Sequence, residues 1–305
     1  MIAQHAGLPV VAGVDGSERA LQAVRWAARE ADRRTVALRL MTVCGWMTDQ
    51  HPEGPGLSPE YREKLLTVAR GHLGTAVTAA REVAPGIEVA QEVRAGFPAP
   101  VLTEESTRTQ LLVLSDRGQG GFTGLLLGSV AVAVVAHASC PVVVVRASMS
   151  AGLVPDTGPV VVGVDGSPTS EAALAFAFDT AARRRAPLLV VHTWQDLMLD
   201  PKVAPLLDWD ARAATERRVL AERLAGWSEK YPDVEVRRLV TRDRPARALR
   251  EQSVDAQLVV VGSRGRGGFA GLLLGSVSQT LLHHSHCPVA VVRPAETEGA
   301  ATGPV

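Results

Sequence analysis

Short runs of valine and leucine alternate along the chain with longer segments in which apolar residues recur at helical spacing. In the C-terminal part the short runs lie at 160–165, 188–193, 234–240, 258–262 and 289–292, and the longer segments lie between them, at 168–184, 205–230, 245–252 and 277–284. Continuous apolar runs are typical of parallel strands buried on both faces, and the longer period is typical of helices. The alternation therefore predicts βαβ units and a doubly wound, Rossmann-like α/β fold.

The whole pattern occurs twice. Val10–Ser17 recurs as Val160–Ser167, and Arg117–Val130 recurs as Arg264–Val277. Each occurrence then closes with Cys-Pro and a valine-rich run. Matches in the same order indicate a duplication. We predict a first repeat at residues 1–146, a linker at 147–158, a second repeat at 159–294 and a flexible tail at 295–305.

A glycine-rich segment in the second repeat carries the candidate chemistry. It reads Gly262-Ser-Arg-Gly265, then nine residues, then Gly275-Ser276-Val277-Ser278 at the start of a predicted helix. We expect Gly265 and Gly275 to adopt positive φ and to direct consecutive N–H groups toward one anion. The N-terminus of the following helix favours a phosphate, and Arg264 adds positive charge. Ser276 and Gln279 fit a capping box that would start this helix.

A carboxylate is expected beside this loop. Parallel α/β sheets bind ligands at the carboxyl ends of their strands, at the point where the strand order reverses. If the order is 3-2-1-4-5, this point lies between the first and fourth strands. Asp165 and the segment 262–265 would then lie around one crevice.

Composition argues against some classes of function. Lys plus Arg equals Asp plus Glu, which gives a formal net charge of zero and argues against a nucleic-acid partner. The longest apolar runs, such as 142–145, are far shorter than a membrane span. Cys44, Cys140 and Cys287 are odd in number and widely spaced, as expected for reduced, buried thiols of a cytoplasmic protein.

Catalytic motifs are missing from the sequence. It contains neither Gly-x-Ser-x-Gly, nor His-Glu-x-x-His, nor a P-loop with its lysine. The run 283–287 is rich in histidine, but it lies at a predicted helix end, where the dipole favours His, and no second ligand cluster has zinc-type spacing. We therefore expect no catalytic residue and no protein-held metal.

The combination of Asp-Gly-Ser turn, glycine loop and Cys-Pro strand resembles the universal stress protein family, over nearly the whole chain apart from linker and tail. The resemblance implies two tandem five-stranded parallel sheets of order 3-2-1-4-5, each with an ATP site. It also implies that the repeats pair through their fifth strands, at 142–145 and 289–292. In the second repeat the implied nucleotide-binding residues are Gly163, Asp165, Thr193, Gly262, Arg264, Gly265, Gly275, Ser276, Val277 and Ser278.

By this resemblance Asp165 meets ribose or adenine, the backbone near Thr193 meets the adenine edge, and the loop meets ribose and phosphates. The corresponding residues of the first repeat are Gly13, Asp15, Val43, Ser115, Arg117, Gly118, Gly128, Ser129 and Val130. That repeat departs from the pattern, because Ser115 replaces the first loop glycine and Ala131 replaces the last serine. Its site is therefore predicted to be weaker or differently selective.

The resemblance implies an ATP-binding regulatory protein of the stress response, with slow hydrolysis at most and with any Mg²⁺ held by the phosphates. A homodimer or another protein is the expected partner besides the adenine nucleotide. Two alternatives stay open. One is an adenine-nucleotide hydrolase on a related fold, and the other is a module that binds a cyclic nucleotide or only a protein.

Overall fold

The computed structural model describes residues 7–45, 58–118, 127–146, 156–194, 209–266 and 273–294. The first repeat contains β1 (Val10–Gly13), α1 (Glu18–Arg34), β2 (Leu38–Cys44), α2 (Pro59–Val83), β3 (Val89–Ala95), α3 (Pro98–Glu105), β4 (Leu111–Ser115), α4 (Ser129–His137) and β5 (Val142–Val145). The second repeat contains β6 (Val160–Gly163), α5 (Pro168–Arg184), β7 (Leu188–Thr193), α6 (Trp209–Lys230), β8 (Val236–Thr241), α7 (Pro245–Gln252), β9 (Leu258–Gly262), α8 (Ser276–His284) and β10 (Val289–Val292). The predicted alternation of strands and helices is confirmed.

The strands form one continuous sheet of ten strands, in the order β3-β2-β1-β4-β5-β10-β9-β6-β7-β8. Within each repeat the order is the predicted 3-2-1-4-5 and every pair is parallel. The prediction of two entirely parallel sheets needs correction, because β5 and β10 pair antiparallel, with Ala290 opposite Val143. Two valine-rich edges would otherwise expose unpaired backbone groups, and this pairing joins them into a mixed sheet.

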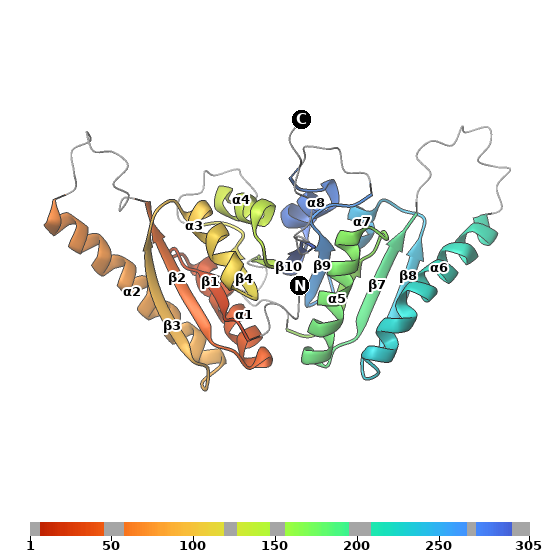
Figure 1. Cartoon of the computed structure of the whole chain (residues 1–305), viewed down its shortest axis with the longest axis horizontal. Helices are drawn as coiled ribbons and strands as arrows, with labels where there is room; N and C mark the ends of the chain where they lie inside the picture. The colour runs from red at the N-terminus through yellow and green to blue at the C-terminus, as the bar shows by residue number, and fades with distance from the viewer. Residues whose placement is uncertain are drawn as a thin grey trace, which may run out of the picture.

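Helices cover both faces of the sheet (Figure 1). On one face, residues of α1, α2, α5 and α6 form a single buried apolar cluster with alternate strand residues such as Val10 and Val160. On the other face, α3, α4, α7 and α8 pack on the intervening residues, such as Val11 and Val161. Every strand position near the centre of the sheet is therefore buried on one face or the other, which explains the uninterrupted apolar runs.

The helix starts follow local rules. The side chain of Ser167 accepts a hydrogen bond from the N–H of Ser170 at the start of α5, and Ser58 caps α2 in the same way. Strand limits differ slightly from prediction: β6 ends at Gly163 rather than at residue 165, and β8 is shifted toward the C-terminus. The predicted start of α6 at residue 205, most of the linker and the whole tail lie outside the described residues.

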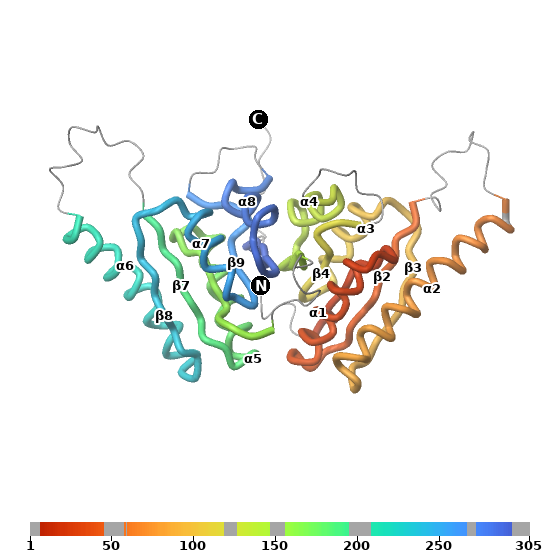
Figure 2. Tube along the Cα trace, turned by 180° about the vertical axis from the view of Figure 1, so that it is seen from behind, coloured from red at the N-terminus to blue at the C-terminus, as the bar shows by residue number. Residues whose placement is uncertain are grey.

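A buried ionic cluster joins the repeats between α1 and α5. Oε1 of Glu30 accepts a hydrogen bond from Arg34 at 2.8 Å, and Oε2 accepts one from Arg184 at 2.6 Å. Arg34 also reaches Asp179 across the interface, at 3.3 Å. Burial acts to raise the pKa of Glu30, but the two guanidinium groups outweigh burial and lower this pKa to about 2. The cluster and the β5–β10 pair together hold the two repeats side by side, as Figure 2 shows from behind.

Among the described helices, none combines the length and the apolar composition that a membrane span requires.

Candidate functional site

A cavity of about 460 Å³ opens in the first repeat where β1, β2 and β4 end. Its walls include all nine residues predicted for this repeat: Gly13, Asp15, Val43, Ser115, Arg117, Gly118, Gly128, Ser129 and Val130. The volume lies within the range of small-molecule sites. The carboxyl ends of parallel strands thus bring together residues that lie far apart in the sequence, and Ser115 does not close the cavity.

Sequence reasoning missed the apolar walls of this cavity. Pro98 and Leu102 of α3 lie four residues apart on one helix face, and Met41 and Leu114 complete the lining from the strands. Apolar residues at this spacing are equally typical of a protein core. No signal in the sequence distinguishes the two roles.

In the second repeat, Asp165 lies in the turn between β6 and α5, where Gly166 adopts a φ of 78°. Its Oδ1 atom accepts hydrogen bonds from Ser167, from the backbone N–H at 2.9 Å and from the hydroxyl at 2.6 Å. Its Oδ2 atom accepts the backbone N–H of Arg266, at 2.9 Å. Burial acts to raise the pKa of Asp165, but these hydrogen bonds outweigh burial and hold the pKa below its ordinary value. The carboxylate is therefore ionised and lies directly against the glycine loop.

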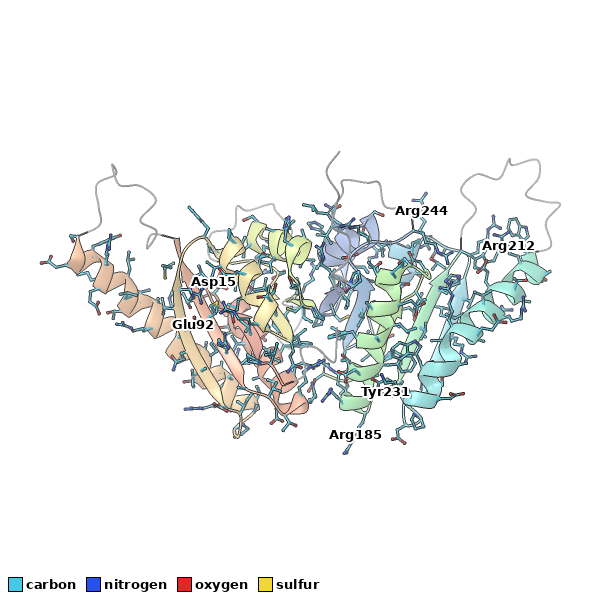
Figure 3. The ribbon with its side chains drawn as sticks, in the orientation of Figure 1. Asp15, Glu92, Arg185, Arg212, Tyr231 and Arg244 are labelled. Carbon is cyan, nitrogen blue, oxygen red and sulfur yellow. The ribbon has the colours of Figure 1, made fainter. Side chains whose placement is uncertain are left out.

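Glycine at position 265 is required by this contact. A Cβ built on Gly265 would lie 2.5 Å from Oδ2 of Asp165. A Cβ on Gly118 in the first repeat would meet Oδ2 of Asp15 in the same way (Asp15 is labelled in Figure 3). A Cβ on Gly262 would lie 2.9 Å from the backbone of Thr169, at the start of α5. Gly265 and Gly118 thus allow the loop to approach the aspartate turn in each repeat, and Gly262 allows the loop to approach the first helix of the second repeat.

The start of α8 corrects two expectations. Gly275, with φ −72°, is the N-cap, and no side chain caps this helix, so the predicted capping box of Ser276 and Gln279 is wrong. Neither Gly265 nor Gly275 has a positive φ. The close approach of Gly275 to Ser263 and Arg264, with its N–H donating to the Ser263 carbonyl at 2.8 Å, explains the glycine instead.

Ser276 is the first residue of α8 and is exposed, as is Arg264 in the loop before it. Both are free to face a ligand at the helix N-terminus. Ser278 is only 2% exposed, and its hydroxyl donates to the carbonyl of Gly262 at 2.7 Å. Contrary to expectation, this hydroxyl fastens α8 to the end of β9. The serine that the first repeat lacks is thus a structural link.

The remaining predicted residues of the second repeat lie at the ends of β6 and β7 and in the first turn of α8. Thr193 is the last residue of β7 and is half-buried. Val277 packs against the apolar layer of α7 and α8. A Cβ on Gly163 would lie 2.8 Å from Leu249 of α7, so packing alone accounts for this glycine.

In the described part of the chain, no three residues of the types His, Cys, Asp and Glu lie close enough together to hold a metal ion. The rings of His283 and His284 lie 6.2 Å apart at the end of α8.

Comparison with known proteins agrees with this geometry. The model of the universal stress protein family matches residues 8–146 and 157–293. The chain belongs to the universal stress protein family.

Among its relatives, universal stress protein Rv2623 of Mycobacterium tuberculosis is 40% identical over 302 residues, which cover 97% of this chain and 100% of that protein. A universal stress protein of Mycolicibacterium smegmatis is 41% identical over 292 residues, covering 93% of this chain and 97% of its own length. The crystal structure of a universal stress protein from Archaeoglobus fulgidus has the same fold, with a TM-score of 0.68 at 21% identity over 96% of this chain and 98% of that chain.

Proposed function

We propose that the chain binds ATP at the carboxyl edge of the sheet in each repeat, and that it acts as a regulatory protein of the stress response rather than as a metabolic enzyme. The observation that carries the proposal is the cavity of about 460 Å³ that all nine predicted residues of the first repeat surround. Its apolar wall suits an adenine ring, and its glycine loop leads to the N-terminus of α4, which favours phosphate.

In the second repeat the phosphates would lie against the start of α8, with Ser276 and Arg264 as ligands. The ribose would meet Asp165, whose Oδ2 atom contacts the loop. The adenine edge would meet the backbone near Thr193 at the end of β7. This assignment follows the family resemblance, and the positions of these residues at neighbouring strand ends support it.

Mg²⁺ fits such a site only as an ion carried by the phosphates. Among the described residues that line the cavity of the first repeat, Asp15 is the one carboxylate, and Ser17 already donates two hydrogen bonds to it. That lining includes neither lysine nor histidine. A general base or a phosphate-activating lysine is not in place there, so any hydrolysis should be slow.

A cytoplasmic location is part of the proposal, and the three buried free cysteines support a reducing compartment. A protein partner would bind the chain differently according to whether nucleotide is bound. A homodimer through the fifth strands is ruled out by the β5–β10 pair within the chain, so further self-association would use another surface.

The experiment is identification of the small molecule that the purified full chain retains, after release by heat, followed by incubation with Mg-ATP. We expect ATP to be retained and little phosphate to be released over many minutes. Rapid, multiple-turnover release of phosphate or pyrophosphate would favour the hydrolase alternative. Retention of a cyclic nucleotide, or of nothing, would contradict ATP as the ligand.

A further inference from the structure

His192 links three elements beside the site of the second repeat. It is the residue before Thr193 on β7, and its Nδ1 atom lies 2.8 Å from the carbonyl oxygen of Val164. Its Nε2 atom lies 3.1 Å from Oε2 of Glu216 on α6. Val164 directly precedes Asp165, so one imidazole connects α6 and β7 to the turn that carries the site aspartate.

Both neighbours of the ring are hydrogen-bond acceptors. A neutral imidazole carries one N–H and satisfies one of them, whereas an imidazolium carries two and satisfies both. The side chains of His192 and Glu216 are 12% and 23% exposed, so water replaces a lost contact poorly. Both contacts are hydrogen bonds only when the ring carries a proton on each nitrogen.

Charged groups lie around the ring and the turn. Glu216 is the carboxylate in contact with the ring, and Asp165 follows Val164 in the turn between β6 and α5. Arg223 of α6 lies over Gly166 and is within 3.7 Å of Glu171 on α5.

Two further side chains lie near His192 among the residues that the structure describes. Arg212, labelled in Figure 3, lies one turn before Glu216 and is directed to the ring of Trp194, at 6.0 Å. On β8, the neighbouring strand, Val240 stands opposite His192 and cannot titrate.

The first repeat holds the equivalent carbonyl without a titratable group. There the hydroxyl of Thr42, on β2, donates to the carbonyl of Val14 at 3.0 Å. Val14 precedes Asp15 as Val164 precedes Asp165. The two repeats therefore hold this carbonyl with different chemistry. The first repeat carries an imidazole elsewhere at its turn, because the ring of His72 on α2 lies over Gly16, so the matched control is the second repeat of the His192→Thr variant.

We propose that His192 is a positioning residue whose proton makes nucleotide affinity in the second repeat depend on pH, with tighter binding in acid. The inference rests on the proposed function. Loss of the proton as pH rises leaves either the Val164 carbonyl or the Glu216 carboxylate without its donor. In either case the link from α6 through His192 to the turn that holds Asp165 is broken at one end, and the seat for the ribose becomes less fixed.

The experiment is a titration of the full chain with ATP, followed by NMR at about pH 6 and about pH 8, on either side of the range in which imidazoles titrate. The amide signals of Gly265 and Gly275 report the second repeat, and those of Gly118 and Gly128 report the first. We expect the dissociation constant of the second repeat to rise at the higher pH by about three- to tenfold more in the unaltered chain than in His192→Thr, the effect of one hydrogen bond. The ionisation of ATP itself affects both proteins and cancels.

Two variants test the cause. In His192→Thr, which places at position 192 the residue type of Thr42 in the first repeat, this additional rise should disappear. Glu216→Gln keeps the histidine and should weaken the pH dependence. Nitrogen shifts of the His192 ring in the unliganded chain should show two protonated nitrogens at about pH 6.

The outcomes separate the two proposals. ATP binding with the same pH response of the second repeat in His192→Thr and in the unaltered chain overturns the role of His192 alone. A single protonated ring nitrogen at about pH 6 also overturns it. Absence of ATP binding in both repeats at both pH values overturns the proposed function, and the affinity effect with it.

Discussion

The Oδ2 atom of Asp165 accepts the backbone N–H of Arg266 at 2.9 Å. An ionised side chain from the turn after β6 thus holds the glycine loop that follows β9. The first repeat has the same proximity between Asp15 and Gly118. A ligand that needs both the aspartate and the loop therefore meets them already joined, and the glycine between them is the most sensitive position of the site.

Replacing Gly265 with alanine tests this contact. The added Cβ would lie 2.5 Å from Oδ2 of Asp165, so the loop and the carboxylate must separate. We expect ATP affinity in the second repeat to fall at least tenfold, while the protein stays folded by circular dichroism. Gly226→Ala is the matched control, since nothing lies within 4 Å of a Cβ there, and it should leave affinity unchanged. Equal affinity in both variants would remove the loop from the site.

Substitution of the two serines at the start of α8 should have different effects, one on the stability of the fold and the other on ATP binding. Ser278→Ala removes the hydrogen bond to the Gly262 carbonyl, so we expect a loss of about 1 kcal/mol in unfolding free energy, or a melting temperature lower by roughly 2 °C. Ser276→Ala, at an exposed position, should keep the melting temperature and weaken ATP binding. Thermal melts with and without ATP measure both effects. The reverse assignment would mean that Ser278 faces the ligand.

The buried cluster between the repeats predicts a specific response to acid. Glu30→Gln leaves Arg184 without the carboxylate that it contacts and leaves Arg34 with Asp179 alone, and we expect a loss of about 3–5 kcal/mol at neutral pH. The pKa of Glu30 is lowered from 4.5 to about 2, so its contribution to stability is present above about pH 4.5 and disappears as pH falls toward 2. Urea unfolding across this range should show the difference between variant and unaltered chain shrinking.

Glu18→Gln, on the same helix but with a side chain 71% exposed, is the control and should change stability little at any pH. A constant difference between Glu30→Gln and the unaltered chain from neutral pH down to about pH 2 would contradict the ionic role of Glu30.

The cysteines should be chemically silent in the folded chain. Burial raises the pKa values of Cys140 and Cys287 to about 12, and it also raises the pKa of Cys44. Because the thiolate is the reactive form, we expect a disulfide reagent at mildly alkaline pH to label none of them quickly in the native protein. All three should react once the chain is unfolded in urea. Fast labelling without urea would show that the segment around one of these cysteines opens readily.

Local rules made much of the fold predictable. The N-cap at Ser167 and the apolar runs of the strands depend on neighbouring residues alone, and the order of strands and helices follows from them. The nine residues of the first cavity were implied by the family resemblance, and the sheet explains their meeting, because parallel strands carry their last residues to one edge.

Features that depend on packing between elements were not predictable. The direction of the Ser278 hydroxyl depends on how α8 sits on β9, and the cap at Gly275 depends on the Ser263 carbonyl. The pairing of Arg184 with Glu30 joins residues 154 positions apart, which no local pattern reveals.

The binding of ATP at the aspartate and the glycine loop is tested most directly by calorimetric titration with Mg-ATP of the full chain, freed beforehand of any retained nucleotide, beside Gly265→Val. The unaltered chain should give a saturable heat, and the variant should lose one binding site per chain while remaining folded. Absence of heat from the unaltered chain, together with a melting temperature that ATP does not change, would contradict the account.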